Sequence, residues 1–200
     1  DFSEPSVAII KHNNACGVAT RSTLLEAWHA ALAGDPVSAF GGVLIANRVI
    51  DMATATEIHK LFFEILISPG FEEGALELLK QKTNRNLLRI KSTEMPAKVY
   101  RSVLNGILEQ DRDLATEGIE QMKQCTVKAA STSELADMVF ANKIAKHSKS
   151  NTIVLAKNQT LLGSGVGQTS RVDALKQAIH KAGSFGFDLH GAVMASDAFF

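Results

Sequence analysis

The feature that most constrains the fold is an alternation of short apolar runs with segments that carry helix-start signals. Four apolar runs of strand length lie at residues 7–10, 43–46, 64–68 and 86–90. Helices are predicted between them at about 26–34, at 52–63 and from Glu72 onward. Strands that alternate with helices of this length are typical of βαβ units, so we expect an α/β fold with a largely parallel sheet.

Capping residues mark where the helices start. Thr23 and Glu26 have the spacing of a capping box, in which a hydroxyl and a carboxylate satisfy otherwise unpaired N–H groups. Asp51 is placed to cap the next helix. The box recurs at Ser131 and Glu134, so we expect a second α/β segment to begin there.

Residues 91–131 differ from what precedes and follows them. They hold two extended pieces, 99–103 and 106–109, and a charged segment at 110–113, and we interpret them as a connector. Beyond them we predict a helix to about His147, strands at 151–156 and 161–163 around a tight turn, a helix from Arg171 and a strand at 192–197. We therefore expect one unit at 1–130, connector included, and a second, truncated unit at 131–200.

Charge and cysteine content exclude several classes of partner. Lys plus Arg equals Asp plus Glu, 21 each, which argues against nucleic acid or a membrane surface as the main partner. Cys16 and Cys125 match no zinc spacing, and a reduced, cytoplasmic location is the simplest interpretation. The chain starts on Asp1 without Met and stops directly after a predicted strand, so we expect it to be part of a longer protein.

The densest cluster of chemical groups follows the first apolar run. Lys11 and His12 precede Asn13 and Asn14, and a small-residue turn reaches Gly17. In an open α/β sheet, ligands bind beyond the carboxyl ends of strands. A lysine and a histidine there suit anion stabilisation and acid–base work. The plainer alternative is a solvated lysine beside a histidine that only satisfies loop carbonyls.

Weaker candidates lie along the chain. Phe40 and Gly41 could form a wall for a flat ring with an N–H that reaches the ligand, or a turn with one core phenylalanine. Hydroxyls and an amide at 148–152 could ligate a monovalent cation, hold a carboxamide or only decorate a strand edge.

The glycine-rich stretch 163–170 lacks the features of a P-loop and the spacing of a dinucleotide fingerprint. Arg171, at a helix start, is more informative, because a guanidinium among unpaired N–H groups can engage phosphate or carboxylate. Asp197 ends an apolar strand, which puts a carboxylate at the ligand edge of the sheet.

Five of these segments occur together, in order, in one known family. They are KHNNACG at 11–17, DPVSAFGG at 35–42, KSN at 149–151, GVGQTSR at 165–171 and SDAFF at 196–200. The chain resembles the transformylase domain of the bifunctional purine biosynthesis family over essentially its whole length. This domain formylates aminoimidazole carboxamide ribonucleotide (AICAR).

The resemblance implies a reaction in the biosynthesis of inosine monophosphate (IMP). The formyl group of 10-formyltetrahydrofolate, the co-substrate, moves to the 5-amino group of AICAR. By resemblance, His12 is the base that takes the amine proton, and Lys11 stabilises the oxyanion of the tetrahedral intermediate. Acyl transfer needs no zinc or redox cofactor.

Other site residues carry over by resemblance. Nucleotide contacts fall at Gly41, Glu64, Asn151, Arg171 and Phe199. The folate pocket is lined at Phe40 and Val172. Some members hold a structural potassium ion, whose ligands would fall at Ser148, Ser150, Thr152 and Asp197, with the Ala145 carbonyl.

The resemblance also implies two cytidine-deaminase-like, three-layer α/β/α units in tandem, and a homodimer with sites at the interface. The chain departs from the family at Ala15, where proline is frequent. It lacks the upstream arginine-tyrosine segment, the acidic folate contact beyond Phe200 and the cyclohydrolase domain. We therefore expect these residues alone to be inactive.

Two alternatives belong to other classes. A zinc-dependent nucleoside deaminase is suggested by fold-level analogy alone, and the His-x-Glu and Pro-Cys-x-x-Cys pair that it requires is absent. A non-catalytic nucleotide-binding or dimerisation module is the other.

Overall fold

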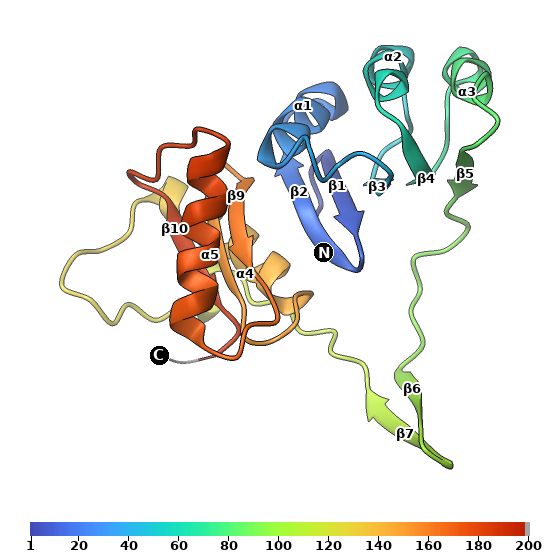
Figure 1. The fold of residues 1–200 in the computed structure, drawn as a ribbon. Coiled ribbons are helices and arrows are strands. Elements are labelled where there is room, and N and C mark those ends of the chain that lie inside the picture. The colour runs from blue at the N-terminus through green and yellow to red at the C-terminus, as the bar shows by residue number, and fades with distance from the viewer. Residues whose placement is uncertain (199–200) are drawn as a thin grey trace.

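The computed structural model describes residues 1–198. Eight strands form one sheet in the order β10-β8-β9-β2-β1-β3-β4-β5 (Figure 1). The strands are β1 Ser6–Lys11, β2 Asn14–Thr20, β3 Gly42–Ala46, β4 Phe63–Ser68, β5 Asn86–Arg89, β8 Ile153–Lys157, β9 Thr160–Gly165 and β10 Val193–Ser196. The α-helices are α1 Leu24–Gly34, α2 Met52–Lys60, α3 Glu73–Lys80, α4 Thr132–Lys146 and α5 Arg171–Ser184, and a 3-10 turn spans Ile119–Gln121. The α/β class is therefore confirmed.

The sheet is mixed, and the expectation of a largely parallel sheet is wrong. Only the β3–β4 and β4–β5 pairs of this sheet are parallel, and the other pairs are antiparallel. The main cause is that the segment from Asn14, which the sequence predicts as a turn, forms strand β2. His12 and Asn13 occupy the turn with φ of 51° and 63°, as a two-residue type I′ hairpin loop requires.

The small residues of β2 allow close packing against α1 and do not form a turn. A Cβ on Gly17 would lie 2.0 Å from the carbonyl oxygen of Ala31 in α1. The glycine thus permits close contact between helix and strand. A second hairpin, β8–β9, turns at Asn158 and Gln159, which also have positive φ.

Helices cover both faces of the sheet around β8 and β9. Side chains alternate along a strand, so Ile153 and Leu155 face α5 while Val154 and Ala156 face α4. The alternation continues into β1, where Val7 and Ile9 pack under α1 and Ala8 packs with the α4 cluster. Helix α1 therefore lies on the face opposite α4.

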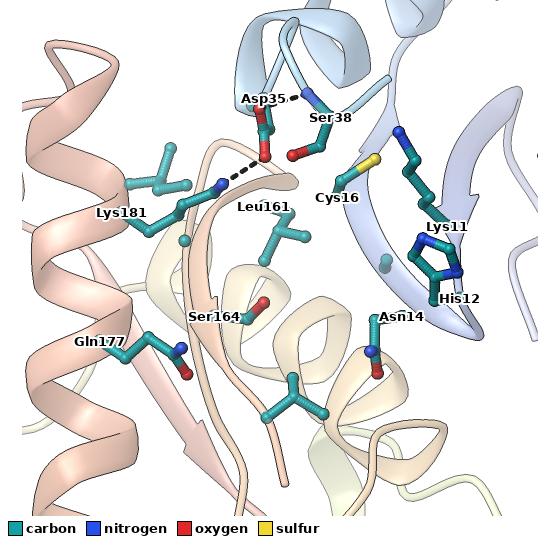
Figure 2. A pocket seen from close by; sticks show the side chains of 15 residues that line it. Lys11, His12, Asn14, Cys16, Asp35, Ser38, Leu161, Ser164, Gln177 and Lys181 are labelled. Atoms are coloured by element: carbon teal, nitrogen blue, oxygen red, sulfur yellow. Dashed lines mark hydrogen bonds and ion pairs between the residues drawn. The ribbon is translucent and has the colours of Figure 1, made fainter. Parts of the chain in front are cut away.

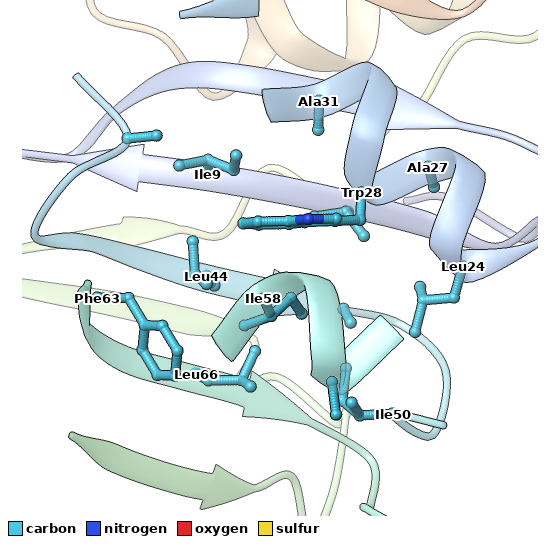
Figure 3. Close-up of a cluster of buried hydrophobic side chains, with 14 of the residues drawn as sticks. Ile9, Leu24, Ala27, Trp28, Ala31, Leu44, Ile50, Ile58, Phe63 and Leu66 are labelled. Carbon is cyan, nitrogen blue, oxygen red and sulfur yellow. The ribbon is translucent and has the colours of Figure 1, made fainter. Parts of the chain in front are cut away.

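The largest core lies between α1, α2 and the strands β1, β3 and β4 (Figure 3). Trp28 of α1 is 1% exposed and lies flat against the strands, with Ile9 and Leu44 beside its ring (Figure 3). Fully burying such a side chain stabilises the fold by roughly 1.5–3 kcal/mol. On the other face of β3 and β4, Val43, Ile45, Ile65 and Ile67 remain partly exposed.

The connector carries a separate hairpin, β6 Lys98–Val103 with β7 Gly106–Asp111, which extends away from the large sheet (Figure 1). The two predicted extended pieces are confirmed. The hairpin exposes apolar side chains, including Tyr100 at 60% and Ile107 at 75%.

The predicted helix starts are confirmed. Capping boxes form at Thr23 and Ser131, and Asp51 accepts the N–H of Thr54 at 2.7 Å. Helix α2 ends at Lys60, earlier than predicted, because Phe63 already begins β4. Among residues 1–198, no helix is both long enough and apolar enough to cross a membrane.

Candidate active site

The predicted site residues lie at one edge of the sheet. Ile10 of β1 pairs with Val43 of β3, and Val43 pairs with Ile65 of β4. The end of β1 therefore lies beside the beginnings of β3 and β4. This register brings Lys11, Gly41 and Glu64 to the same edge, although they lie on three different strands or loops.

The second half of the chain reaches the same edge through the β2–β9 pair. Ala19 pairs with Thr160, and β9 runs antiparallel to β2, so β9 ends where β2 began. Ile153, at the start of β8, pairs with both Gly165 of β9 and Ser196 of β10. Asn151, Asp197 and the start of α5 at Arg171 therefore share this edge.

Lys11 is tied to the loop between α1 and β3. Its ammonium group donates to the carbonyl oxygen of Phe40 at 2.9 Å. The Phe40 ring packs on Phe62 with centroids 5.2 Å apart, yet 58% of Phe40 remains exposed. Phe40 therefore presents an exposed aromatic surface beside Lys11 and is not a core residue.

The Gly41 N–H, which the sequence suggests as a ligand contact, donates to the Phe62 carbonyl at 2.9 Å. Gly41 has φ of +71°, a conformation that L side chains rarely adopt, so the hydrogen bond and the glycine both serve the turn.

His12 and Glu64 are exposed at this edge, on the β1–β2 turn and on β4. A pocket of about 300 Å³ opens between the β1–β2 hairpin and α5 (Figure 2). Lys11 and His12 line one side, and Gln177 and Lys181 of α5 line the opposite side (Figure 2).

Cys16 lines the same pocket. Burial, with a smaller contribution from the nearby Asp35 carboxylate, raises the pKa of the Cys16 thiol to about 11. The thiol is therefore neutral near pH 7 and serves as part of the wall rather than as a nucleophile.

Arg171 and Asp197 form a second cluster at the same edge. The Arg171 side chain donates to Ser196 Oγ at 2.9 Å and to Asp197 Oδ1 at 3.3 Å. The same carboxylate oxygen accepts the backbone N–H of Thr152 at 2.9 Å. Burial opposes ionisation of Asp197, but hydrogen bonds from Ser150, Thr152 and Arg171 outweigh it and lower its pKa.

Asn151 and Val172 flank this cluster. The backbone N–H and the side-chain amide of Asn151 both donate to the Gln168 carbonyl, at 3.1 and 3.0 Å. Val172 is 57% exposed beside Arg171. Phe199, the remaining predicted nucleotide contact, lies outside the described residues.

The predicted potassium ligands supply only oxygen atoms. Ser148 and Thr152 donate their hydroxyl protons to the carbonyls of Ile144 and Gly165, which leaves lone pairs on both hydroxyl oxygens. Oxygen donors of this kind suit hard cations. Within residues 1–198, no three or more His, Cys, Asp and Glu side chains gather in a way that could hold a metal ion.

The two clusters begin on strands that are not neighbours. Lys11 ends β1, and Asn151 precedes β8, which lies three strands away in the sheet. Neighbouring strands are about 4.8 Å apart, so the backbones of β1 and β8 are roughly 14 Å apart. Each cluster alone holds only part of the predicted site.

Sequence reasoning missed an ion pair at the wall of the pocket. Asp35, at the end of α1, is 1% exposed and pairs with Lys181 of α5 (Figure 2). Asp35 lies in a recognised motif, but nothing local in the sequence indicates Lys181 as its partner, because tertiary packing alone joins the two residues.

Comparison with known proteins gives the family. The model of a family described as the AICARFT/IMPCHase bienzyme matches residues 1–181. The chain belongs to the AICARFT/IMPCHase bienzyme family. Over 200 residues it is 61% identical to the bifunctional purine biosynthesis protein PurH of Bacteroides thetaiotaomicron, covering all of this chain and 39% of that protein.

More distant PurH proteins match in the same way. The identity is 47% over 198 residues with that of Chlorobium chlorochromatii, covering 98% of this chain and 38% of the relative. It is 43% over 203 residues with that of Persephonella marina, covering all of this chain and 39% of the relative. The chain thus spans about two fifths of the length of the curated relatives it matches.

Proposed function

We propose that this AICARFT/IMPCHase chain is part of the transformylase portion of a longer bifunctional protein, and that it supplies the catalytic residues with which that protein transfers a formyl group to AICAR. The observation that carries the proposal is the placement of Lys11 and His12 at the open sheet edge. The Lys11 ammonium is held 2.9 Å from the Phe40 carbonyl, beside an exposed aromatic ring, and His12 is exposed next to it.

The chemistry of the pair suits acyl transfer. The AICAR amine attacks the formyl carbon of 10-formyltetrahydrofolate, and a C–N bond forms as the carbonyl oxygen becomes an oxyanion. Lys11 stabilises this oxyanion, and His12 takes the amine proton. The bond from the formyl carbon to the folate nitrogen then breaks, and that nitrogen is protonated.

Each role has an expected magnitude. A positioned general base contributes roughly 10²–10⁴ in rate. Loss of an oxyanion donor costs about 3–4 kcal/mol of transition-state stabilisation. The amine is a poor nucleophile because its lone pair is delocalised into the imidazole ring and carboxamide, so both contributions are needed.

We further infer that two copies complete one site. Lys11 ends β1, and Asn151 precedes β8, which lies three strand spacings, roughly 14 Å, from β1 in the same sheet. This backbone separation supports a site that Lys11 and His12 of one copy share with Asn151 and Arg171 of its partner in a homodimer.

Three finer proposals accompany this function. The helices and hairpin after Ser131 form a second cytidine-deaminase-like unit after the first. A potassium ion binds the oxygen atoms of Ser148, Ser150, Thr152 and Asp197. The longer protein also closes the ring to IMP and acts in the cytoplasm.

The test is a formyl-transfer assay on the full-length bifunctional protein with His12→Ala and Lys11→Met variants. We expect each substitution to lower kcat by roughly 10²-fold or more while AICAR still binds by calorimetry. Near-normal turnover of the His12→Ala protein would overturn the base assignment. Nucleotide binding without formyl transfer in the unaltered protein would instead favour a non-catalytic binding module.

A further inference from the structure

We propose that Asp35 and Lys181 are positioning residues for Lys11, and that their ion pair sets where the Lys11 ammonium lies. The catalytic part of this inference rests on the proposed formyl transfer. The two residues come from different segments, the end of α1 and helix α5, and they meet at the wall of the pocket, in the upper part of the view in Figure 2.

Asp35 organises the loop that holds Lys11. Its Oδ1 accepts the backbone N–H of Ser38 at 2.9 Å, and its carbonyl accepts the N–H of Ala39 at 3.1 Å. The Ala39 carbonyl accepts the N–H of Gly42 at 3.0 Å, where β3 begins. Phe40 lies within this hydrogen-bonded loop, and its carbonyl is the acceptor for Lys11.

The packing of α5 against β9 fixes the position of Lys181. On the same helix, Ala178 and Ala182 lie so close to β9 that a Cβ on Gly163 would be 2.4 Å from the Ala178 carbonyl. The helix therefore has little freedom to move away from or along the sheet. The Lys181 ammonium also lies 5.3 Å from the centre of the Phe185 ring, which limits its movement.

The Asp35–Lys181 ion pair stays closed because the buried Asp35 carboxylate requires a cation beside it. Burial opposes ionisation of Asp35, but hydrogen bonds from Lys181 and Ser38 outweigh it and lower its pKa. A buried carboxylate without its cation must either take a proton or move toward water. Either change disturbs the loop at Ser38 and, through it, the Phe40 carbonyl.

These contacts form a chain of support from α5 to the reacting atoms. Lys181 holds Asp35, Asp35 holds the loop, and the loop carbonyl of Phe40 holds Lys11. A small displacement of a catalytic group can cost about 10²-fold in rate. Lys181 itself need not touch either substrate for this effect.

The first test is kinetic and uses the full-length bifunctional protein. We expect Lys181→Met to lower kcat for formyl transfer by about 10–100-fold with the KM for AICAR changed less than about twofold. Lys181→Arg, which keeps the charge, should recover much of this loss. Because Lys181 acts through Lys11, adding Lys181→Met to a Lys11→Met protein should lower kcat by less than about twofold more.

Lys176→Met is the matched control. Lys176 lies on the same helix and is ion-paired to Asp173 at 3.9 Å, but its side chain is 75% exposed. Loss of an exposed pair has little effect, so kcat should stay at the unaltered value. Unchanged kcat in Lys181→Met, or a full additional loss in the Lys11→Met background, would overturn the proposal.

The second test does not depend on activity. Hydrogen exchange should be about tenfold faster or more at the amides of Ser38, Ala39 and Gly42 in the Lys181→Met protein, and unchanged in Lys176→Met. Unchanged exchange at these amides in Lys181→Met would overturn the positioning role. Absence of formyl transfer in the unaltered protein would instead overturn the proposed function and the catalytic part of this inference.

Discussion

At the scale of single residues, contacts between separate segments hold the charged groups of the candidate site, as between Lys11 and the Phe40 carbonyl or between Asp35 and Lys181. Lys11 and His12 stand out in the sequence because a cation and an imidazole follow an apolar run. Nothing local indicates that Lys11 donates to Phe40 or that Asp35 pairs with Lys181, because those contacts require the fold. The hydrogen bond from the Gly41 N–H to the Phe62 carbonyl likewise depends on the fold, because it joins residues 21 positions apart.

Asp197 gives a prediction on stability against pH. Its carboxyl pKa is lower in the folded protein than in the unfolded chain, so its ionised form stabilises the fold above the unfolded pKa of about 4. This contribution is lost as pH falls through the folded pKa. In urea denaturation, Asp197→Asn should lower the unfolding free energy at pH 7 and make it less dependent on pH below about 5.

Asp173→Asn serves as the control for this effect, because Asp173 lies on the surface of α5 and its ion-pair partner is 3.9 Å away. That substitution should change the pH dependence much less. An equal effect of the two substitutions would contradict the stabilising role of the Asp197 hydrogen bonds.

At the scale of elements, local hydrogen bonding made the helices predictable. The capping boxes at Thr23 and Ser131 use residues within one turn, so the sequence contains all the information they need. Strand β2 was missed because Asn14, Ala15 and Gly17 lack the β-branched or aromatic character of typical strands. Their small size allows α1 to pack close to β2, and this contact joins residues outside the local strand pattern.

Gly17 and Gly183 test that explanation with the same substitution. Gly17→Ala would put a Cβ 2.0 Å from the Ala31 carbonyl, so α1 must shift and the chain should lose roughly 1–3 kcal/mol of stability. Gly183 lies within α5, and a Cβ there meets nothing within 4 Å. Gly183→Ala should therefore be neutral or stabilise by up to about 1 kcal/mol.

The measurement is the midpoint of urea denaturation for the two variants beside the unaltered chain. A Gly17→Ala chain as stable as the original would show that the contact between α1 and β2 relaxes at little cost. A strongly destabilised Gly183→Ala chain would show that replacing glycine by alanine is costly in this chain even where the added Cβ meets no neighbouring atom.

At the scale of the whole molecule, the sheet joins segments that no local pattern connects. Residues 14–20 and 160–165 become neighbours through the β2–β9 pair, which aligns both halves of the predicted site at one edge. The motif order in the sequence supplies the candidate residues of the site. It could not predict their separation, which depends on how many strands lie between β1 and β8.

That separation leads to a prediction about assembly. If His12 of one copy and Arg171 of its partner complete one site, a heterodimer of a His12→Ala subunit and an Arg171→Ala subunit has one site with both defects and one intact site. Mixing the two inactive full-length variants under conditions that exchange subunits should then restore activity. With random exchange, half of the dimers are heterodimers with one good site each, so the expected recovery is about a quarter of the unaltered value.

The control is a mixture of His12→Ala with Lys11→Met. His12 and Lys11 are adjacent in the chain and act in the same site, so each of the two sites in that heterodimer has one of the two substitutions. No recovery of activity is expected. If both clusters of one chain served the same site, the His12→Ala and Arg171→Ala mixture would also stay inactive. Sedimentation or native mass spectrometry must show that exchange has occurred, because only then does an inactive mixture contradict a shared site.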